Sequence, residues 1–585
     1  MAETAGDILV ETLIDWGVEV LFGIPGDGIN GVFEALRKRQ DRIRFIQVRH
    51  EETAAFAACA YAKWTGRLGV CIATSGPGGI HLLNGIYDAK LDNQPVLAIT
   101  GLQYHDLLDT FTQQDVALDK TFMDPCAYSV RVMGPEHVEN VTELACRTAL
   151  GYRQPAHISI PVDIQSMPVK TSRRSKRNVA GHVSDLMARG GHLPDEAQLA
   201  QAAEILSQAK KPFILAGRGA LGARAELEEM AAKLKAPVGM ALLGKGAIPD
   251  RSPYATGGVG LLGTRASQEA FQGCDTLLIV GSTFPYIEFY PEPGKARAVQ
   301  IDLDPKRIGL RYPVEAGLVG DSRQTLSALL PMVRENGDGD HLAAAQDAMR
   351  EWRELMEERG TRRDSPMKPQ VVTHELNKLL ADDAIIVTDS GTVTSWTARH
   401  IDMRGEMMFS CSATLASMAN GLGYAIAAAV AFPDRQVVAV MGDGALAMLM
   451  GDLVTLRKYH LDNVRIVVIK NNTLGQIKWE QMVFLGNPEF GCELEPIDFA
   501  AVARGCGIEA ITIDDAERCG DQLHAALRTK GPCLIEAVVD PNEPPMPPKV
   551  APDEALHLAE ALARGTPAAG KIAKTIAENV VRELV

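Results

Sequence analysis

Apolar residues along the chain come in short unbroken runs rather than in alternation with polar ones. From Leu68 the order is an apolar run LGVCIAT, a glycine loop SGPGG, a helical segment IHLLNGIYDAKLD and a second apolar run PVLAITG. Unbroken Val, Ile and Leu runs are typical of parallel strands that are covered on both faces. A helical segment between two such strands predicts a doubly wound α/β unit.

The same rhythm recurs twice more. The second set of runs is PFILAGRGAL, DTLLIVGSTF and ARAVQIDLDP, and the third is AIIVTDSGT, QVVAVMGDG, VRIVVIKNN and CLIEAVVD. We therefore expect an α/β fold of three doubly wound parallel-sheet domains followed by a tail. The boundaries that we predict are 1–175, 190–340 and 365–545 for the domains and 546–585 for the tail. Polar connections are expected at 170–196 and 335–369, the latter largely as a long helix.

Composition narrows the class of protein. A chain that is 46% hydrophobic and 23% charged is typical of a globular protein with large cores. The net charge of -15 argues against nucleic acid as a partner, since no basic domain offsets it. The ten cysteines are scattered without a CxxC pair, and the acidic start is unlike a secretory signal. We expect reduced thiols and a cytoplasmic protein.

One strand of the third set ends in Gly442-Asp443-Gly444, and the next strand ends in Asn-Asn. Loops at the carboxyl ends of parallel strands form the sites of such sheets, and a right-handed crossover brings these two ends together. A helix is expected over 445–459, and its free N–H groups would favour an anion. Carboxylate, amide and carbonyl oxygens beside a phosphate suit Mg²⁺. A plain tight turn is the alternative, and the Asn-Asn pair disfavours it.

This GDG…NN pattern resembles the cofactor signature of thiamine diphosphate enzymes. The resemblance implies that the side chains of Asp443 and Asn471 hold Mg²⁺ together with the main-chain carbonyl of Thr473. Asn471 is chosen because it lies four residues before Gly475. Further residues that the resemblance places at the cofactor are Gly442, Gly444, Ala445 and Gly475.

A second stretch, VRHEETAAFAACAYAKWTGRLGVCIATSGPG, is similar to the pyrimidine-binding half of the same family. The Glu that follows His, Glu51, is then the catalytic one. Its carboxylate would hydrogen-bond the aminopyrimidine ring and promote the imino form that removes the thiazolium C2 proton. The neighbouring Glu52 is expected on a solvated helix face.

Other positions are assigned through the same resemblance. In ATLASMANGLGYA, Met418 is expected to wedge the cofactor into a bent shape, with packing in a core as the alternative. Gly391 and Thr392 of TDSGT resemble the loop that touches the diphosphate. His81 could face the substrate or could be an ordinary satisfied helix histidine.

The middle segment resembles the FAD-binding domain of bacterial pyruvate oxidases and quinone-linked pyruvate dehydrogenases. The stretches that carry this resemblance are GLLG, GSTFPYIEFYP and VQIDLDP. Glycine turns admit a pyrophosphate, and an Asp that closes a strand can accept ribose hydroxyls. The residues that we expect at FAD are Gly260, Gly263, Ser282, Thr283, Phe284, Asp302 and, as a weaker candidate, Asp321.

These resemblances imply oxidative decarboxylation of an α-keto acid, with pyruvate as the expected substrate. The expected product is acetate or acetyl phosphate, and the expected electron acceptor is quinone or oxygen. A non-redox carboligase of acetolactate synthase type is the alternative, and a scaffold that has lost its activity is disfavoured because Glu51 and Asp443 are both present. The family implies a homo-oligomer, at least a dimer and usually a tetramer.

Some positions match the oxidases and others depart from them. Glu480 matches an active-site Glu of that group, whereas Gln476 replaces the usual aromatic residue. The Phe-Gln pair of the family is interrupted here, because Thr112 separates Phe111 from Gln113. Both departures lie where substrate and flavin are expected to meet.

The tail carries an apolar stripe at helical spacing, formed by Ile572, Ile576, Val580 and Leu584. Docking on the protein's own surface is the expected role. The alternative is peripheral contact with the inner face of the membrane, as in quinone-linked pyruvate dehydrogenases.

Overall fold

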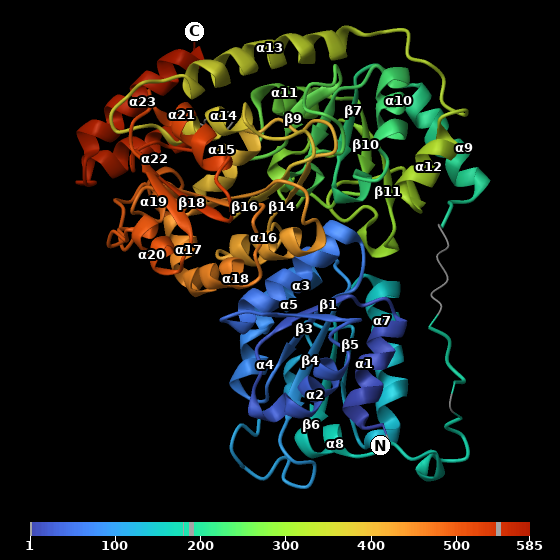
Figure 1. Ribbon diagram of the computed structural model, residues 1–585. Coiled ribbons are helices and arrows are strands. Elements are labelled where there is room, and N and C mark those ends of the chain that lie inside the picture. The colour runs from blue at the N-terminus through green and yellow to red at the C-terminus, as the bar shows by residue number, and fades with distance from the viewer. Residues whose placement is uncertain (1–2, 180, 186–191, 546–551, 585) are drawn as a thin grey trace.

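A computed structural model describes residues 3–179, 181–185, 192–545 and 552–584 of the protein (Figure 1). It contains three six-stranded sheets, and all of their strand pairs are parallel. Helices flank each sheet, so the predicted α/β fold class is confirmed. The domain boundaries given above stay predictions.

The first sheet has the strand order β2-β1-β3-β4-β6-β5. Its strands are β1 (Val20–Gly23), β2 (Arg44–Gln47), β3 (Gly69–Ala73), β4 (Val96–Leu102), β5 (Tyr128–Arg131) and β6 (Ala156–Pro161). The helices around it are α1 (Ala5–Asp15), α2 (Asn30–Lys38), α3 (Glu51–Thr65), α4 (Pro77–His81), α5 (Leu83–Leu91), α6 (Leu118–Thr121), α7 (Val138–Tyr152) and α8 (Val162–Ser166).

The middle sheet has the order β12-β11-β10-β7-β8-β9. Numbered within the sheet and read from β9, this is 3-2-1-4-5-6, the order of dinucleotide-binding folds. Its strands are β7 (Pro212–Ala216), β8 (Val238–Met240), β9 (Ala255–Gly258), β10 (Thr276–Val280), β11 (Arg297–Asp302) and β12 (Ala316–Val319). Its helices are α9 (Glu196–Ser207), α10 (Arg224–Leu234), α11 (Arg265–Gly273) and α12 (Ser322–Leu329).

The third sheet, β14-β13-β15-β16-β18-β17, repeats the topology of the first. Its strands are β13 (Ile385–Thr388), β14 (Met408–Ser410), β15 (Val437–Gly442), β16 (Val464–Lys470), β17 (Glu509–Ile513) and β18 (Cys533–Val538). Its helices are α14 (Pro369–Asn377), α15 (Thr392–His400), α16 (Asn420–Ala431), α17 (Asp443–Leu449), α18 (Leu453–Lys458), α19 (Gly475–Val483), α20 (Phe499–Gly505) and α21 (Cys519–Leu527). The expected long connecting helix is α13 (Asp340–Gly360), which crosses the top of the molecule in Figure 1.

The helix expected over 445–459 is broken into α17, a short turn over 450–452 and α18. The carboxylate of Asp452 in that turn accepts hydrogen bonds from the backbone N–H of Arg49, at 2.7 Å, and from the hydroxyl of Thr455, at 2.7 Å. Arg49 belongs to the unit of the first sheet. The helix is therefore interrupted at the point where it contacts a segment that is remote in sequence.

The first and third units meet where α3 packs on α16 (Figure 1). The contact is fully buried and rich in alanine, with Gly423 facing Phe56: a Cβ at Gly423 would lie 2.9 Å from the Phe56 Cβ. At its far end Lys63 is buried with Asp88 and Asp92, and its Nζ lies 2.7 Å from Asp92 and 3.8 Å from Asp88. Burial alone would lower the pKa of Lys63, but the two carboxylates raise it above its usual value.

Two helices form the tail, α22 (Pro552–Ala563) and α23 (Ala569–Leu584), and α22 packs on α19. Ile572 is fully buried in a cluster with Trp479, Met482 and Ala561, so the tail docks on the protein's own surface as expected. The side chains of Val580 and Leu584 lie outside the described residues. Among the described residues, no helix has the length and apolar character needed to cross a bilayer.

We expect Lys63→Met to destabilise the contact between the first and third units by about 3–5 kcal/mol, because it leaves two buried carboxylates without their cation. Hydrogen exchange of α3 and α16, together with the thermal unfolding temperature, measures the effect. Lys90→Met, which removes an ion pair with the exposed Asp124, is the matched control and should behave as the wild type. Wild-type protection of α3 in Lys63→Met would contradict the expectation.

Candidate active site

The carboxyl ends of β15 and β16 bring Asp443 to Asn471. The strands are paired in parallel register up to Gly442 opposite Ile469, so the residues that follow must be neighbours. Asp443 Oδ2 accepts hydrogen bonds from the backbone N–H of Asn471, at 3.0 Å, and of Asn472, at 2.6 Å. The GDG and NN segments therefore form one site, as their spacing predicts.

This turn gathers oxygen atoms. Asn471 Oδ1 accepts a hydrogen bond from the backbone N–H of Thr473 at 3.1 Å, and the carbonyl of Thr473 accepts one from Gly475 at 2.8 Å. Burial raises the pKa of Asp443, while the N–H groups of Asn472, Gly444 and Asn471 oppose that shift. A carboxylate, an amide oxygen and a carbonyl oxygen in one turn fit a hard divalent cation such as Mg²⁺.

Around this turn several glycines leave room for a ligand. A Cβ at Gly442 would meet no atom of the described residues within 4 Å, and neither would one at Gly391, whose φ of +127° favours glycine. A Cβ at Gly475 would lie 3.2 Å from both Asn471 and Thr392, so these residues share one surface. Ala445 is buried and offers only its backbone.

Met418 lies over the GDG turn. A Cβ at Gly444 would be 3.5 Å from Met418 Cε, and the Met418 side chain is only partly buried. Asp389 holds the segment that follows by accepting the backbone N–H of Ala419 and of Gly421, each at 2.9 Å. Packing in a closed core, the alternative raised for Met418, does not describe this position.

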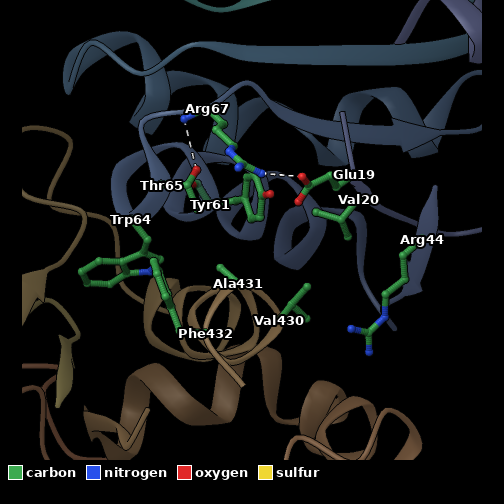
Figure 2. A pocket seen from close by; sticks show the side chains of 10 residues that line it. All are labelled: Glu19, Val20, Arg44, Tyr61, Trp64, Thr65, Arg67, Val430, Ala431 and Phe432. Carbon is green, nitrogen blue, oxygen red and sulfur yellow. Dashed lines mark hydrogen bonds and ion pairs between the residues drawn. The ribbon is translucent and has the colours of Figure 1, made fainter. Parts of the chain in front are cut away.

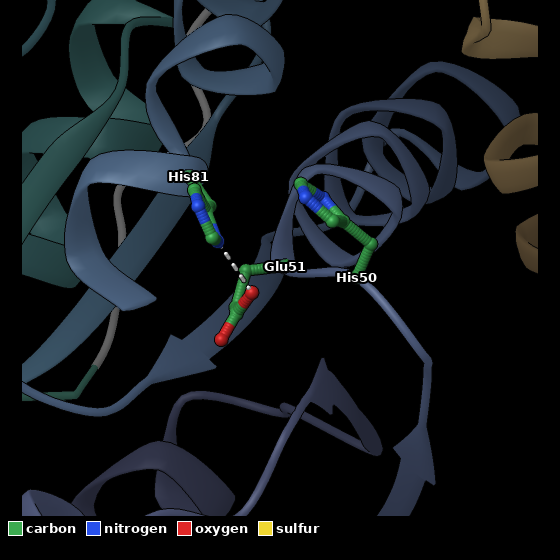
Figure 3. Close-up of side chains that lie close together, drawn as sticks. All are labelled: His50, Glu51 and His81. Atoms are coloured by element: carbon green, nitrogen blue, oxygen red, sulfur yellow. Dashed lines mark hydrogen bonds and ion pairs between the residues drawn. The ribbon is translucent and has the colours of Figure 1, made fainter. Parts of the chain in front are cut away.

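Glu51 begins α3 and is paired with His81 (Figure 3). His81 Nδ1 lies 2.9 Å from Glu51 Oε2, so this nitrogen carries the proton when it donates to the carboxylate. The ring of His50 is stacked on that of His81 with centroids 4.6 Å apart. Gly78 of the SGPGG loop lies close by, since a Cβ there would be 3.2 Å from Glu51 Oε1. His81 is thus hydrogen-bonded within the protein, as the alternative of a satisfied helix histidine requires, and its partner is the candidate catalytic residue Glu51.

The expectation that Glu52 is solvated is wrong. Its Oε1 accepts a hydrogen bond from Asn84 Nδ2 at 2.7 Å, and the same Nδ2 lies 2.9 Å from Ser417 Oγ. Because Ser417 precedes Met418, this chain of contacts ties the Glu51 end of α3 to the Met418 loop.

Glu480 lies on α19 and accepts a hydrogen bond from Gln476 Nε2 at 3.0 Å. The two residues line a small cavity together with Ser395 of α15 and Leu261 of the middle unit. Loop 260–263 of the middle unit therefore reaches the surface of α19.

The structure shows a glutamine that the sequence analysis passed over. Gln114 Oε1 accepts a hydrogen bond from Ser75 Oγ at 2.6 Å, which joins its loop to SGPGG. Gln113 is not the residue that makes this bond, and Phe111 is fully exposed. The doubled Gln-Gln in the sequence was the available signal, and only the loop conformation selects the second.

The residues expected at FAD fall into two groups. Thr283 and Asp302 lie at the carboxyl ends of strands, whereas the others cap a helix or pack within the middle unit. Thr283 Oγ1 accepts a hydrogen bond from Arg307 at 3.1 Å, and Asp302, whose pKa burial raises, closes β11. By contrast, Asp321 caps α12 by accepting the N–H of Gln324 at 3.0 Å. The Oγ of Ser282 accepts a hydrogen bond from the backbone N–H of Phe284 at 3.3 Å. The buried Phe284 packs against Gly260, and Gly263 packs against Gly258.

Three arginines that the sequence motifs did not single out, Arg153, Arg218 and Arg307, lie near one another, and Arg307 donates a hydrogen bond to Thr283. Arg218 follows β7, and one of its nitrogens lies 3.2 Å from the carbonyl oxygen of Asn93, while Arg307 lies 2.7 Å from Asn93 Oδ1. Burial and the nearby Arg153 lower the pKa of Arg218 to about 10. A possible signal was the G-x-G-x-x-G pattern from Gly217 to Gly222 directly after a strand, which is weak by itself.

Comparison with known proteins identifies the family. Three models of thiamine pyrophosphate enzyme domains match: the N-terminal TPP binding domain over 3–122, the central domain over 199–329 and the C-terminal TPP binding domain over 389–537. The chain belongs to the thiamine pyrophosphate enzyme family. It is therefore an enzyme that depends on thiamine diphosphate, as the GDG…NN signature and the Glu51 stretch indicate.

Relatives within this family have different names. YdaP of Bacillus subtilis, whose name marks it as a thiamine pyrophosphate-containing protein, is 39% identical over 94% of this chain and 93% of its own. A pyruvate oxidase of Lactiplantibacillus plantarum is 33% identical over 92% of this chain and 89% of its own. An acetolactate synthase large subunit of Parasynechococcus marenigrum is 30% identical over 92% and 88%.

We expect Glu51→Gln to keep the fold and to lower turnover by at least about 10²-fold, since an amide cannot replace the carboxylate in proton transfer. Steady-state kinetics of the cofactor-loaded enzyme measures this. Glu34→Gln, at an exposed carboxylate on α2, is the matched control. Activity close to wild type in Glu51→Gln would remove Glu51 from the reaction.

Asp443→Asn should lose Mg²⁺-dependent retention of thiamine diphosphate, because the change removes the only carboxylate of the predicted metal set. The thiamine diphosphate content of the purified protein, assayed with and without Mg²⁺, reports the loss. Asp195→Asn changes a helix cap far from the site and should retain the cofactor. Equal retention in both variants would show that Asp443 is not a metal ligand.

Proposed function

We propose that the protein catalyses the oxidative decarboxylation of an α-keto acid, namely pyruvate, to acetate or acetyl phosphate, with thiamine diphosphate, Mg²⁺ and FAD. Quinone or oxygen would take the electrons. When bound, thiamine diphosphate supplies the carbon nucleophile that adds to the keto group, and FAD accepts an electron pair. The remaining work falls to residues of the chain.

In this proposal Asp443, Asn471 and the Thr473 carbonyl hold the Mg²⁺, and the open surface at Gly442 and Gly391 receives the diphosphate. Glu51 holds or releases a proton at one carboxylate oxygen, while His81 donates to the other through Nδ1. That hydrogen bond fixes the orientation of the carboxylate. Met418 limits the space above Gly444 and so favours a bent cofactor.

The observation that supports FAD is the arrangement of the middle unit. Its 3-2-1-4-5-6 sheet has its switch point between β7 and β10, and ligands of such sheets bind outside the carboxyl ends at that point. Arg218 follows β7 and Thr283 follows β10, with Arg153 and Arg307 nearby. Among the described residues Arg218 makes no ion pair, so this cluster has a surplus of positive charge that suits a diphosphate.

Contact between the units supports a redox role for that flavin. Leu261 of the middle unit and Glu480 of the third unit line one cavity. Glu480 also matches an active-site Glu of pyruvate oxidases. A flavin on the middle unit would thus approach the thiamine site. The second candidate is a non-redox carboligase, and the similarity to acetolactate synthases favours it.

A homo-oligomer, at least a dimer and by analogy with the family a tetramer, is part of the proposal. The loop that carries Phe111 exposes large apolar side chains: Tyr104 is 51% exposed, Leu107 43% and Phe111 100%. A contiguous loop with such side chains is typical of a surface that another chain covers.

A visible spectrum of the purified protein tests the function. Anaerobic addition of pyruvate to enzyme loaded with Mg²⁺ and thiamine diphosphate should bleach the flavin band. Glu51→Gln should show the same flavin band, because the variant keeps the middle unit intact. Pyruvate should not bleach that band, because the variant lacks the carboxylate needed for turnover. A band that persists in the wild type would favour the carboligase, and a protein that binds no flavin in saturating FAD would contradict the assignment of the middle unit.

A further inference from the structure

A second cleft lies at the opposite end of the α3–α16 pair from the catalytic residues (Figure 2). Its volume is about 540 Å³, within the range of small-molecule sites. It opens beside Val20 and Arg44, where β1 and β2 begin. The candidate catalytic loops follow the carboxyl ends of strands, so this cleft is on the other edge of the first sheet.

One wall of the cleft is apolar and the other is polar. The end of α16 supplies Val430, Ala431 and Phe432, and the end of α3 supplies Trp64. Tyr61, Thr65 and Arg67 lie across from them in Figure 2. A ligand that fills the cleft would need an apolar body and a polar group.

The charges in the cleft favour a single negative charge on that group. Arg67 is paired with Glu19 at 2.6 Å, so these two charges cancel. Arg44 is exposed, and within the described part of the chain it makes no ion pair; its guanidinium carbon lies 5.9 Å from the Tyr459 ring centroid. One uncompensated guanidinium matches one carboxylate, whereas a phosphate dianion would require a second free cation.

We propose that this cleft binds a small carboxylate with a flat apolar body, which acts as an effector of the enzyme. The carboxylate pairs with Arg44, and the apolar body covers Val430 and Phe432. This is a site separate from that of the keto acid, because none of its lining residues belongs to the candidate active site.

The helices that line the cleft explain how occupancy reaches the reaction. α3 begins at Glu51 and its last turn lines the cleft, while α16 begins just after Met418 and ends at Ala431. The two helices are packed tightly and are joined by hydrogen bonds from Lys63 and Trp64 to Tyr424, so a ligand between their far ends biases how they cross. This step rests on the proposed function, since it takes Glu51 and Met418 as catalytic groups.

Calorimetric titration of the full-length, cofactor-loaded protein with 2-naphthoate tests the site without any turnover. One saturable site per chain is expected. The uncharged 2-naphthamide should bind to the wild type at least about tenfold more weakly than naphthoate does, and naphthoate should bind to Arg44→Gln more weakly by the same factor. Arg42→Gln removes the same charge two residues away, outside the cleft, and should bind as the wild type. The absence of saturable binding, or equal affinity in wild type and Arg44→Gln, would overturn the proposal.

Hydrogen exchange separates the effector role from the proposed function. Naphthoate should change exchange at the catalytic ends, residues 51–55 and 418–422, by about twofold or more in wild type and not in Arg44→Gln. Binding that leaves both ends unchanged would overturn the effector role. Failure of pyruvate to bleach the flavin would instead overturn the redox proposal and leave both of these results standing.

Discussion

The close crossing of α3 and α16 is the contact on which the arrangement of the site depends. Alanine-rich faces and Gly423 let the helices approach, because a Cβ at Gly423 would clash with Phe56. The approach excludes water, and a charge in such a contact needs its counter-charge and hydrogen bonds. Lys63 has both: it donates to Asp92, to the carbonyl of Cys411 and to the hydroxyl of Tyr424, which in turn donates to Asp88.

The same contact positions the loop that carries Met418. Asp92 accepts the backbone N–H groups of Ala413 and Thr414, at 3.3 and 3.2 Å, and Asn84 reaches Ser417. Residues of the first unit therefore determine the path of a loop in the third unit. Because α3 starts with Glu51, the same contact relates Glu51 to the loop that carries Met418. The contact between α3 and α16 therefore holds in place two segments that are far apart in the sequence.

In the middle unit, the sheet topology and close loop packing position the arginine cluster more than any sequence motif does. Its glycines at 217, 219 and 281 let two loops meet closely, since a Cβ at Gly217 would lie 2.3 Å from the carbonyl of Gly281. That contact places Arg218 beside Thr283 and Arg307. Positive charge held without a carboxylate partner in a buried position is costly unless an anion balances it. Arg307 has a carboxylate partner in Asp304, at 3.7 Å, whereas Arg218 makes no ion pair within the described part of the chain.

The sequence by itself determined the three parallel sheets and the GDG…NN turn. These follow from local rules: unbroken apolar runs form parallel strands, and parallel register makes the ends of consecutive strands neighbours. Tertiary structure alone decided which glutamine meets Ser75, that Glu52 is bonded to Asn84, and that Arg153, Arg218 and Arg307 converge. The reason is physical, because burial and partners come from segments far apart in the chain, and no local pattern encodes which of them will meet.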